Sequence, residues 1–233
     1  MDKWLKSVQS WWLPAICLLC GAAGRGGLDI CSACCHELPW QGAACERCGE
    51  ALATMGVCGH CQRNPPAFDR TYAVFDYAEP IDRLVHELKF HGKLHTASLL
   101  GLLMGQRLLA QVSALPDLLL PVPLHPQRLR QRGFNQSVEL GRWLAREMKL
   151  PLSVDGCRRR RATPAQVGQS AEARRHNLAG AFEVVADVRG KRVALLDDVM
   201  TTGSTVDALA TVLQRAGVGQ VQVWVCARAS RLR

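Results

Sequence analysis

The sequence predicts an α/β protein, in which a parallel sheet has helices between its strands and follows a small cysteine-rich module. Residues 193–196 form a continuous apolar run, which is typical of a strand buried on both faces of a parallel sheet. Other short apolar runs alternate with segments of helical spacing. Nine of the eleven cysteines lie between residues 17 and 61, and 233 residues suffice for one large domain plus this module.

The N-terminal segment shares some features with a signal peptide. Lys3 and Lys6 precede an apolar run at residues 11–19, but Pro14 interrupts this run, which is also far too short to span a membrane. A lipoprotein cleavage site requires a small residue before the cysteine, and Ile16 is not small. We therefore expect no export, a cytoplasmic location, and a helix that packs through residues of helical spacing: Trp4, Val8, Trp11 and Trp12.

Eight of the cysteines form four C-x-x-C pairs arranged as an internal repeat. In each half a second pair follows the first after a similar interval, and a glycine (Gly21 or Gly49) follows the first pair. Two such pairs close a tetrahedral four-thiolate Zn²⁺ site, whereas disulfides require an oxidising compartment. The pattern predicts two structural zinc sites with no position left for water, and a platform for nucleic-acid or protein contacts.

The repeat favours consecutive pairing of the C-x-x-C motifs, and interleaved pairing stays open. The expected ligand sets are Cys17, Cys20, Cys31 and Cys34 in one site and Cys45, Cys48, Cys58 and Cys61 in the other. Cys35 is adjacent to a ligand, but the spacing favours Cys34. Cys157 and Cys226 are expected to be buried thiols without a role.

The middle of the chain is expected to form a helical cap or linker followed by a strand and a rigid loop. The pattern predicts a strand at 71–77, helices at 79–90 and 94–109, and a buried strand at 117–122. Three prolines between residues 121 and 126 then give a rigid loop at a strand's carboxyl end, where open α/β folds bind ligands. Three arginines come next, Arg128, Arg130 and Arg132. A helix that ends near residue 149 follows them.

Residues 157–177 form a polar and basic segment with little apolar periodicity. It contains four consecutive arginines, 158–161, and then Thr163, Gln166, Gln169, Arg174, Arg175, His176 and Asn177. A mobile loop that orders over an anionic substrate has this composition, and a solvated surface loop is the alternative. A strand is expected at about 181–185.

Two acids and a hydroxyl-rich loop follow the apolar run at 193–196. Asp197 and Asp198 come at its carboxyl end, residues 201–205 read Thr-Thr-Gly-Ser-Thr, and a helix is expected at 206–216. The loop offers backbone N–H groups, hydroxyls and the positive end of a helix dipole, and all three bind phosphate. The acids suit ribose hydroxyls and a hard cation. These features predict a ribose 5-phosphate that carries a metal-bound pyrophosphate.

Two other interpretations of this stretch exist. One is an ordinary buried strand followed by a capped helix. The other is a P-loop NTPase, which is excluded because the chain contains no G-x-x-x-x-G-K-[ST] motif.

Residues 193–205, VALLDDVMTTGST, resemble the 5-phosphoribosyl-1-pyrophosphate (PRPP) signature of type I phosphoribosyltransferases at all thirteen positions. Over residues 15–205 the chain resembles the ComF/GntX group of phosphoribosyltransferase-like proteins, which are linked to bacterial competence and DNA utilisation. Besides this signature and the double CxxC module, the matching strings are LKFHGK (88–93), PVPLHPQRLRQRGFNQS (121–137), RATPAQ (161–166) and RRHNLAGAF (174–182).

The resemblance implies a type I phosphoribosyltransferase fold, which is a twisted, mostly parallel sheet with flanking helices and a hood. It implies an N-terminal helix with a double zinc ribbon at 1–64, a hood or linker at 65–112 and a phosphoribosyltransferase-like domain at 113–233. Residues 158–176 would be its flexible loop. In the site, Asp197 and Asp198 would hold the ribose hydroxyls. The 5-phosphate would lie on Thr201, Thr202, Gly203, Ser204 and Thr205, and the pyrophosphate loop would be Leu124, His125, Pro126 and Gln127, with Arg128 or Arg132 nearby.

The expected function is that of a Mg²⁺-dependent, PRPP-binding phosphoribosyltransferase, a pentosyl glycosyltransferase, that acts in DNA uptake or utilisation. Asp197, Asp198 and Arg132 would act at its reacting centre, and no acceptor is identified. The alternative is a non-catalytic protein that binds PRPP and single-stranded DNA, with other competence or DNA-processing proteins as partners. A PRPP sensor is a third interpretation.

The basic residues favour a phosphorylated ligand. The formal net charge is +9, and arginine, which binds phosphate in a bidentate manner, clusters at 128–132, 158–161 and 174–175. Single-strand binders usually interleave aromatic and basic residues, so an aromatic content of only 6% argues against extensive base stacking.

Overall fold

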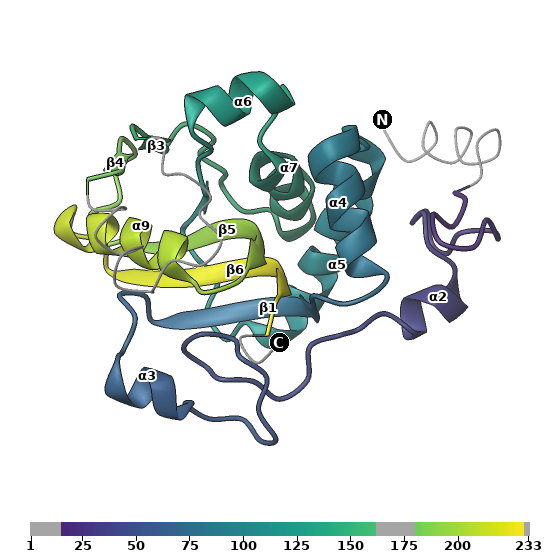
Figure 1. Cartoon of the computed structure of the whole chain (residues 1–233), viewed down its shortest axis with the longest axis horizontal. Helices are drawn as coiled ribbons and strands as arrows, with labels where there is room; N and C mark the ends of the chain where they lie inside the picture. Colours follow the sequence, from purple (N-terminus) through teal and green to yellow (C-terminus); the bar gives the residue numbers. More distant parts are fainter. Residues whose placement is uncertain (1–14, 162–179, 231–233) are drawn as a thin grey trace.

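The computed structural model describes residues 15–161 and 180–230, and within them a four-stranded parallel sheet forms the centre of the molecule (Figure 1). The strands lie in the order β1 (Arg70–Asp76), β6 (Gln220–Arg228), β5 (Arg192–Met200) and β2 (Leu118–Pro121). Each neighbouring pair is parallel. The predicted fold class is confirmed, although β6 was not predicted from the sequence.

Strand β5 is buried on both faces, as its apolar run predicts. Residues 193–196 have no exposed surface. Because side chains alternate across a strand, Val193 and Leu195 enter one hydrophobic cluster, and Ala194 and Leu196 enter the other. The sequence predicts that the strand ends just before the acidic pair, but β5 includes both acids. Its pairing with β6 continues as far as Met200, which is opposite Arg228.

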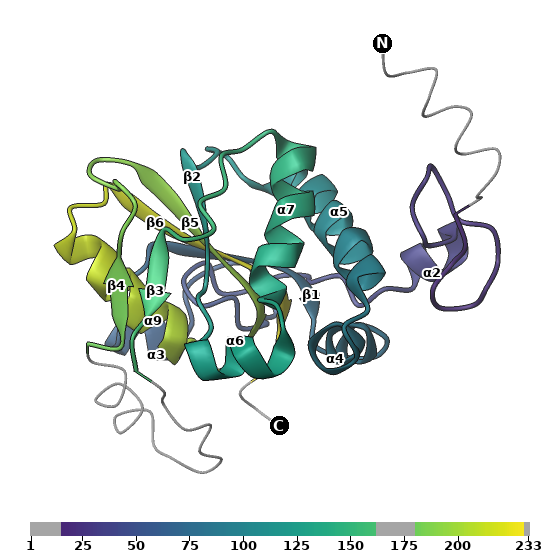
Figure 2. The ribbon, with the colours of Figure 1, turned by 90° about the horizontal axis from the view of Figure 1, so that it is seen from above.

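Helices cover both faces of the sheet (Figures 1 and 2). Helices α4 (Ile81–His91), α5 (Leu94–Gln111) and α7 (Gln136–Met148) lie on one side, and α9 (Ser204–Arg215) lies on the other. Their buried residues belong to the two hydrophobic clusters that the sheet separates. The predicted helices at 79–90 and 94–109 correspond to α4 and α5. Helix α9 begins two residues earlier than predicted.

Two short strands and a short helix lie outside the four-stranded sheet. Strands β3 (Cys157–Arg159) and β4 (Phe182–Val184) pair in antiparallel fashion. The segment before β3 touches β2 through a bridge between Leu119 and Leu152. Helix α6 is Pro126–Arg132. The prediction that the basic segment lacks strand structure is therefore wrong at 157–159, where pairing with β4 supplies hydrogen bonds that periodicity does not reveal.

Two predictions fall wholly or mostly outside the described part of the chain. The N-terminal helix with Trp4, Val8, Trp11 and Trp12 lies within residues 1–14. Most of the predicted flexible loop, from Thr163 to Asn177, lies within 162–179. Residues 231–233 are also outside it. None of the helices within the described ranges has the length and apolar character needed to cross a bilayer.

The two zinc ribbons pack at different places on the fold. The first includes α2 (Ser32–His36), and its Leu28, Ile30 and Leu38 join the hydrophobic cluster of α4 and α5. The second includes α3 (Gly59–Arg63), and Cys45, Cys48 and Cys61 join the cluster of α9. Figure 1 shows α2 and α3 near opposite ends of the molecule. Segments this small bury too little surface for a core of their own, so each ribbon uses the core of the larger fold.

Candidate functional site

The acidic pair lies in the last part of β5 and is held by side chains from two helices. Asp198 is buried, and its Oδ2 lies 2.6 Å from the Nζ of Lys89 on α4. Asp197 Oδ1 accepts hydrogen bonds from the Ser137 hydroxyl of α7 and from the Asp198 N–H, both at 3.0 Å. Helices α4 and α7 therefore bring one cation and one hydroxyl to the two carboxylates.

Burial alters the protonation of the acidic pair. It raises the pKa of Asp197 to about 7, and the adjacent Asp198 charge adds to this effect. Lys89, the Asp198 N–H and the Ser137 hydroxyl act in the opposite direction. The Asp197 carboxyl therefore holds its proton more tightly than an exposed aspartate does, and changes in its surroundings can change its charge.

Three arginines add positive charge around the two acids. The Arg132 guanidinium lies 5.6 Å from the centre of the Phe90 ring and donates to Gln136 Oε1. Burial lowers its pKa, while Asp198 opposes and Arg128 reinforces this change. Arg159 stacks on Phe182 at 5.5 Å.

Burial also lowers the pKa of Arg159, where Arg128 reinforces and Asp197 opposes the change. The excess positive charge around the two carboxylates suits a polyanion. It comes from four cationic side chains: Lys89, Arg128, Arg132 and Arg159.

The hydroxyl-rich loop connects β5 to the first turn of α9. Gly203 has a left-handed conformation with φ of 81° and caps the helix, which begins at Ser204. The Thr202 and Ser204 hydroxyls lie 2.8 Å apart. The first N–H groups of a helix have no partner within the helix, and α9, at 12 residues, is long enough to carry a substantial dipole. The loop therefore presents the donor groups that a phosphate requires.

The predicted pyrophosphate loop is only partly a loop. Leu124 and His125 follow β2, but α6 starts at Pro126, so Pro126 and Gln127 are helical. His125 Nδ1 accepts from the Gln127 N–H at 3.3 Å and caps this helix. The expected rigid loop is thus shorter than predicted, because proline is well suited to the first turn of a helix.

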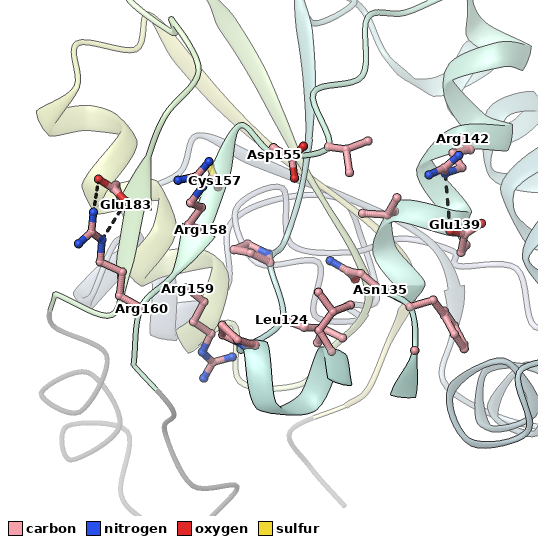
Figure 3. Close-up of a pocket in the computed structure, with 17 residues that line it drawn as sticks. Leu124, Asn135, Glu139, Arg142, Asp155, Cys157, Arg158, Arg159, Arg160 and Glu183 are labelled. Carbon is pink, nitrogen blue, oxygen red and sulfur yellow. Dashed lines mark hydrogen bonds and ion pairs between the residues drawn. The ribbon is translucent and has the colours of Figure 1, made fainter. Parts of the chain in front are cut away.

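A cavity of about 750 Å³ lies beside this segment, between α6, α7 and the β3–β4 pair (Figure 3). Its wall includes Leu124 and Asn135, and the arginines of β3 line the opposite side. Two ion pairs neutralise part of its charge: Arg160 with Glu183, and Arg142 with Glu139. Neither Asp197 nor Asp198 lines this cavity. The cavity therefore does not contain the acidic pair.

The eight predicted zinc ligands form two clusters, each made from consecutive C-x-x-C pairs. Within each cluster the four sulfur atoms lie within 4.8 Å of one another, and all eight cysteines are free thiols. The structure thus decides between the two pairings left open by the sequence. Cys35 is buried and belongs to neither cluster, as expected. Four convergent thiols match the donor set of a structural zinc site.

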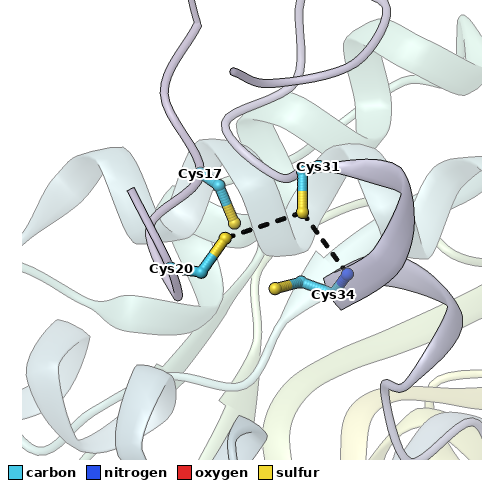
Figure 4. A group of neighbouring side chains, drawn as sticks. All are labelled: Cys17, Cys20, Cys31 and Cys34. Carbon is cyan, nitrogen blue, oxygen red and sulfur yellow. Dashed lines mark hydrogen bonds between the residues drawn. The ribbon is translucent and has the colours of Figure 1, made fainter. Parts of the chain in front are cut away.

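Backbone N–H groups contact sulfur atoms in both clusters, and Figure 4 shows the contact in the first. In the first cluster the Cys34 N–H lies 3.4 Å from Cys31 Sγ, and in the second the Cys58 N–H lies 3.3 Å from Cys45 Sγ. Burial raises the pKa of Cys45, but N–H groups including that of Cys58 outweigh it and leave the pKa at about 7. Both predicted turn glycines, Gly21 and Gly49, have positive φ. These donors favour the thiolate form that binds Zn²⁺.

Three residues near the site were not assigned a role from the sequence: Lys89, Ser137 and Arg228. Lys89 and Ser137 lie within the strings LKFHGK and PVPLHPQRLRQRGFNQS, so their signal was present but gave no partner. Arg228 ends the buried strand β6. A single arginine after an apolar run is the only sign of it in the sequence.

Comparison with known proteins agrees with both parts of the chain. The double zinc ribbon domain family matches residues 8–62, and the phosphoribosyl transferase domain family matches residues 135–232. DNA utilization protein YhgH of Escherichia coli O157:H7 is 39% identical over 224 residues, which cover 93% of this chain and 98% of that protein.

Two competence proteins are also similar. Competence protein F of Haemophilus influenzae is 34% identical over 88% of this chain and 95% of its own length. Competence protein ComFC of Bacillus subtilis is 24% identical over 81% of this chain and 79% of its own length. The chain therefore belongs to the family of DNA utilization protein YhgH and competence protein F, and it joins a double zinc ribbon to a phosphoribosyltransferase domain.

Proposed function

We propose that this protein binds PRPP together with Mg²⁺ and transfers its phosphoribosyl group during DNA uptake or utilisation. The observation that carries the proposal is the meeting of three features at one end of the sheet. These are the acidic pair, the hydroxyl-rich loop before α9 and the group of four cations around them. The kinship with a DNA utilization protein supports the cellular context.

In this proposal the loop and the acids hold the ribose 5-phosphate. The N–H groups and hydroxyls of residues 201–205 bind the 5-phosphate at the positive end of the α9 dipole. Asp197 and Asp198 accept hydrogen bonds from the ribose hydroxyls. Charge-assisted bonds of this kind contribute about 1.5–3 kcal/mol each, so this pair provides a large part of the affinity for the sugar.

The pyrophosphate lies near residues 124–127 and Arg132. Arginine binds phosphate oxygens through a planar fork of N–H donors, and the adjacent Arg128 supplies a second cation. When bound, Mg²⁺ would neutralise further charge on the leaving group. During transfer the bond from the anomeric carbon to the pyrophosphate oxygen breaks, and its electron pair leaves with the pyrophosphate. An acceptor nucleophile forms the new bond, and the protein contributes position and electrostatic stabilisation.

Calorimetric titration with PRPP and Mg²⁺ tests this proposal. We expect binding by the wild-type protein and none by the folded double variant Asp197→Asn, Asp198→Asn. The control is Asp117→Asn, Asp187→Asn, which removes two exposed carboxylates elsewhere and should bind normally. Unchanged affinity in the folded Asp197, Asp198 variant would sink the assignment. Pyrophosphate release with purine bases, pyrimidine bases or ammonia then tests turnover.

The second candidate is a non-catalytic protein that binds PRPP and single-stranded DNA. Three exposed arginines lie on or beside β3: Arg158, Arg160 and Arg161. They favour this candidate, because the PRPP site does not use all of them. PRPP binding without pyrophosphate release for any acceptor, together with DNA binding, would favour this candidate over the enzyme.

A further inference from the structure

Arg228 joins the second cysteine cluster to the start of the hydroxyl-rich loop at residues 201–205, which is called the phosphate loop below. It is almost fully buried at the end of β6. Its Nε donates to the Cys48 carbonyl at 2.9 Å, and one terminal nitrogen lies 2.6 Å from Glu50 Oε2. The other terminal nitrogen donates to the carbonyls of Met200 at 3.0 Å and Thr201 at 2.6 Å. One guanidinium thus contacts both the turn at Cys48–Glu50, called the knuckle below, and the phosphate loop.

The two loop carbonyls determine where the following N–H groups point. A trans peptide is planar, so its C=O and N–H point in opposite directions. Arg228 therefore orients the Thr202 N–H through the Thr201 carbonyl. Together with the Ala229 N–H, which also donates to the Met200 carbonyl, it orients the Thr201 N–H. The Thr201 and Thr202 N–H groups belong to the loop that would receive the phosphate. The guanidinium is a rigid fork, so displacement of its other end is transmitted to the loop.

The knuckle on the other side is held by the cluster and by β1. Cys48 is one of the four clustered thiols, and its carbonyl is the one that Arg228 binds. Thr71 of β1 donates from its hydroxyl to the Arg47 carbonyl at 2.7 Å. A cavity of about 350 Å³ lies between the second cluster and the phosphate loop. Its lining includes Cys48 and Cys61 from the cluster and Thr202, Gly203 and Ser204 from the loop. The cluster and the loop are therefore neighbours.

We propose that Arg228 is a positioning residue that couples metal binding at the second cluster to anion binding at the phosphate loop. Zinc on the four thiolates fixes the Cys48 peptide, this peptide fixes the guanidinium, and the guanidinium orients the loop. The inference rests on the proposed PRPP site. Because coupling between the affinities of two sites is reciprocal, PRPP also raises the affinity of the second cluster for zinc. The first cluster lies near the opposite end of the molecule (Figure 1) and is outside this coupling.

Two matched cysteine variants test the coupling. Cys31 and Cys58 occupy equivalent positions, because each caps a short helix and each is a clustered thiol. Cys31→Ser and Cys58→Ser should each lose one zinc by metal analysis. Calorimetry with PRPP and Mg²⁺ should then show an affinity about ten-fold lower in Cys58→Ser than in Cys31→Ser. Equal affinities in the two variants would overturn the coupling while leaving the proposed function intact.

A chelator experiment tests the role of Arg228 itself. Zinc release from the wild-type protein is followed with a chromogenic chelator, with and without PRPP and Mg²⁺. At equilibrium, PRPP should reduce the amount of zinc that the chelator removes from one of the two sites. Arg228→Lys should keep both ions in the absence of chelator but lose this protection. Protection that persists in Arg228→Lys would overturn the role of Arg228. If the wild-type protein binds no PRPP in calorimetry, the proposed function fails and the coupling fails with it. If Arg228→Lys does not fold, the cysteine pair decides.

Discussion

The ammonium nitrogen of Lys89 lies 2.6 Å from the buried carboxylate of Asp198, and this contact joins α4 to the end of β5. The Lys89 side chain is 21% exposed and that of Asp198 is 4% exposed. A buried carboxylate requires a partner because desolvation of an isolated charge is costly. Lys89 therefore compensates the charge that the proposed ribose site needs, and it holds α4 over that site.

Loss of this ion pair should destabilise the fold. Lys89→Met leaves the Asp198 carboxylate buried and unpaired, so we expect the free energy of unfolding to fall by about 3 kcal/mol. Urea unfolding at neutral pH measures this change. Lys93→Met is a matched control, because it breaks the more exposed pair with Glu87 and should cost less than about 1 kcal/mol. Equal losses in the two variants would contradict the role given to the Lys89 pair.

The raised pKa of Asp197 predicts that Asp197→Asn stabilises the protein in a pH-dependent way. The pKa is about 7 in the folded state and 3.8 for the unperturbed group. Between these values the folded chain holds a proton that the unfolded chain has lost, so wild-type stability falls as pH rises. We expect Asp197→Asn to gain on the order of 2 kcal/mol over wild type between pH 4 and 8.

Asp117 provides the control of opposite sign for that experiment. Its hydrogen bonds to Arg192 lower its pKa, so its ionised form stabilises the fold above the unfolded pKa, and this contribution is lost as pH falls. Asp117→Asn should therefore show no gain over wild type as pH rises. Thermal melts of both variants from pH 4 to 8 make the comparison. A flat difference between Asp197→Asn and wild type would contradict the shifted pKa.

Metal analysis should find two zinc ions per chain. Each cluster offers four thiols and no open position for water, and loss of structural zinc removes folding free energy. We expect Cys34→Ser to retain one zinc with a lower melting temperature. Cys35→Ser should retain two, because Cys35 lies outside both clusters. Loss of a zinc in Cys35→Ser would show that the wrong one of these adjacent cysteines has been assigned as the ligand.

If the arginines on and beside β3 contact DNA, binding should be strongly salt-dependent. Each neutralised phosphate contributes a slope of about −0.7 to a plot of log affinity against log salt concentration for single strands. Arg158→Gln, Arg161→Gln should reduce the magnitude of the slope by about 1.4. Anisotropy with a labelled oligonucleotide measures it, and addition of PRPP tests whether the two ligands share arginines.

The double variant Arg189→Gln, Arg215→Gln removes the same charge from other exposed positions and should leave the slope nearly unchanged. If both double variants reduce the slope equally, the attraction comes from net charge alone. No DNA binding by the wild-type protein at low salt would argue against direct contact.

The features that the sequence predicted are those that depend on neighbours in the chain. The apolar run of β5, the acids after it, the loop and the C-x-x-C pairs each lie within a few residues, so composition and spacing reveal them. Boundaries were less accurate. The strand continues past the acids because it pairs with β6, and α6 begins inside the expected loop at Pro126. The domain limits at 64 and 112 and the ligand roles of the site residues remain predictions.

The partners of those features were decided only by the tertiary structure. Ser137 binds Asp197 across 60 residues, and Arg228 binds Cys48 across 180. Lys89 likewise reaches Asp198 from another element, and the pairing of the C-x-x-C motifs depends on how each ribbon packs. Periodicity and motif spacing describe only local geometry. Which distant side chain compensates a buried charge depends on sheet order and helix packing, which bring together residues that have no relationship in the sequence.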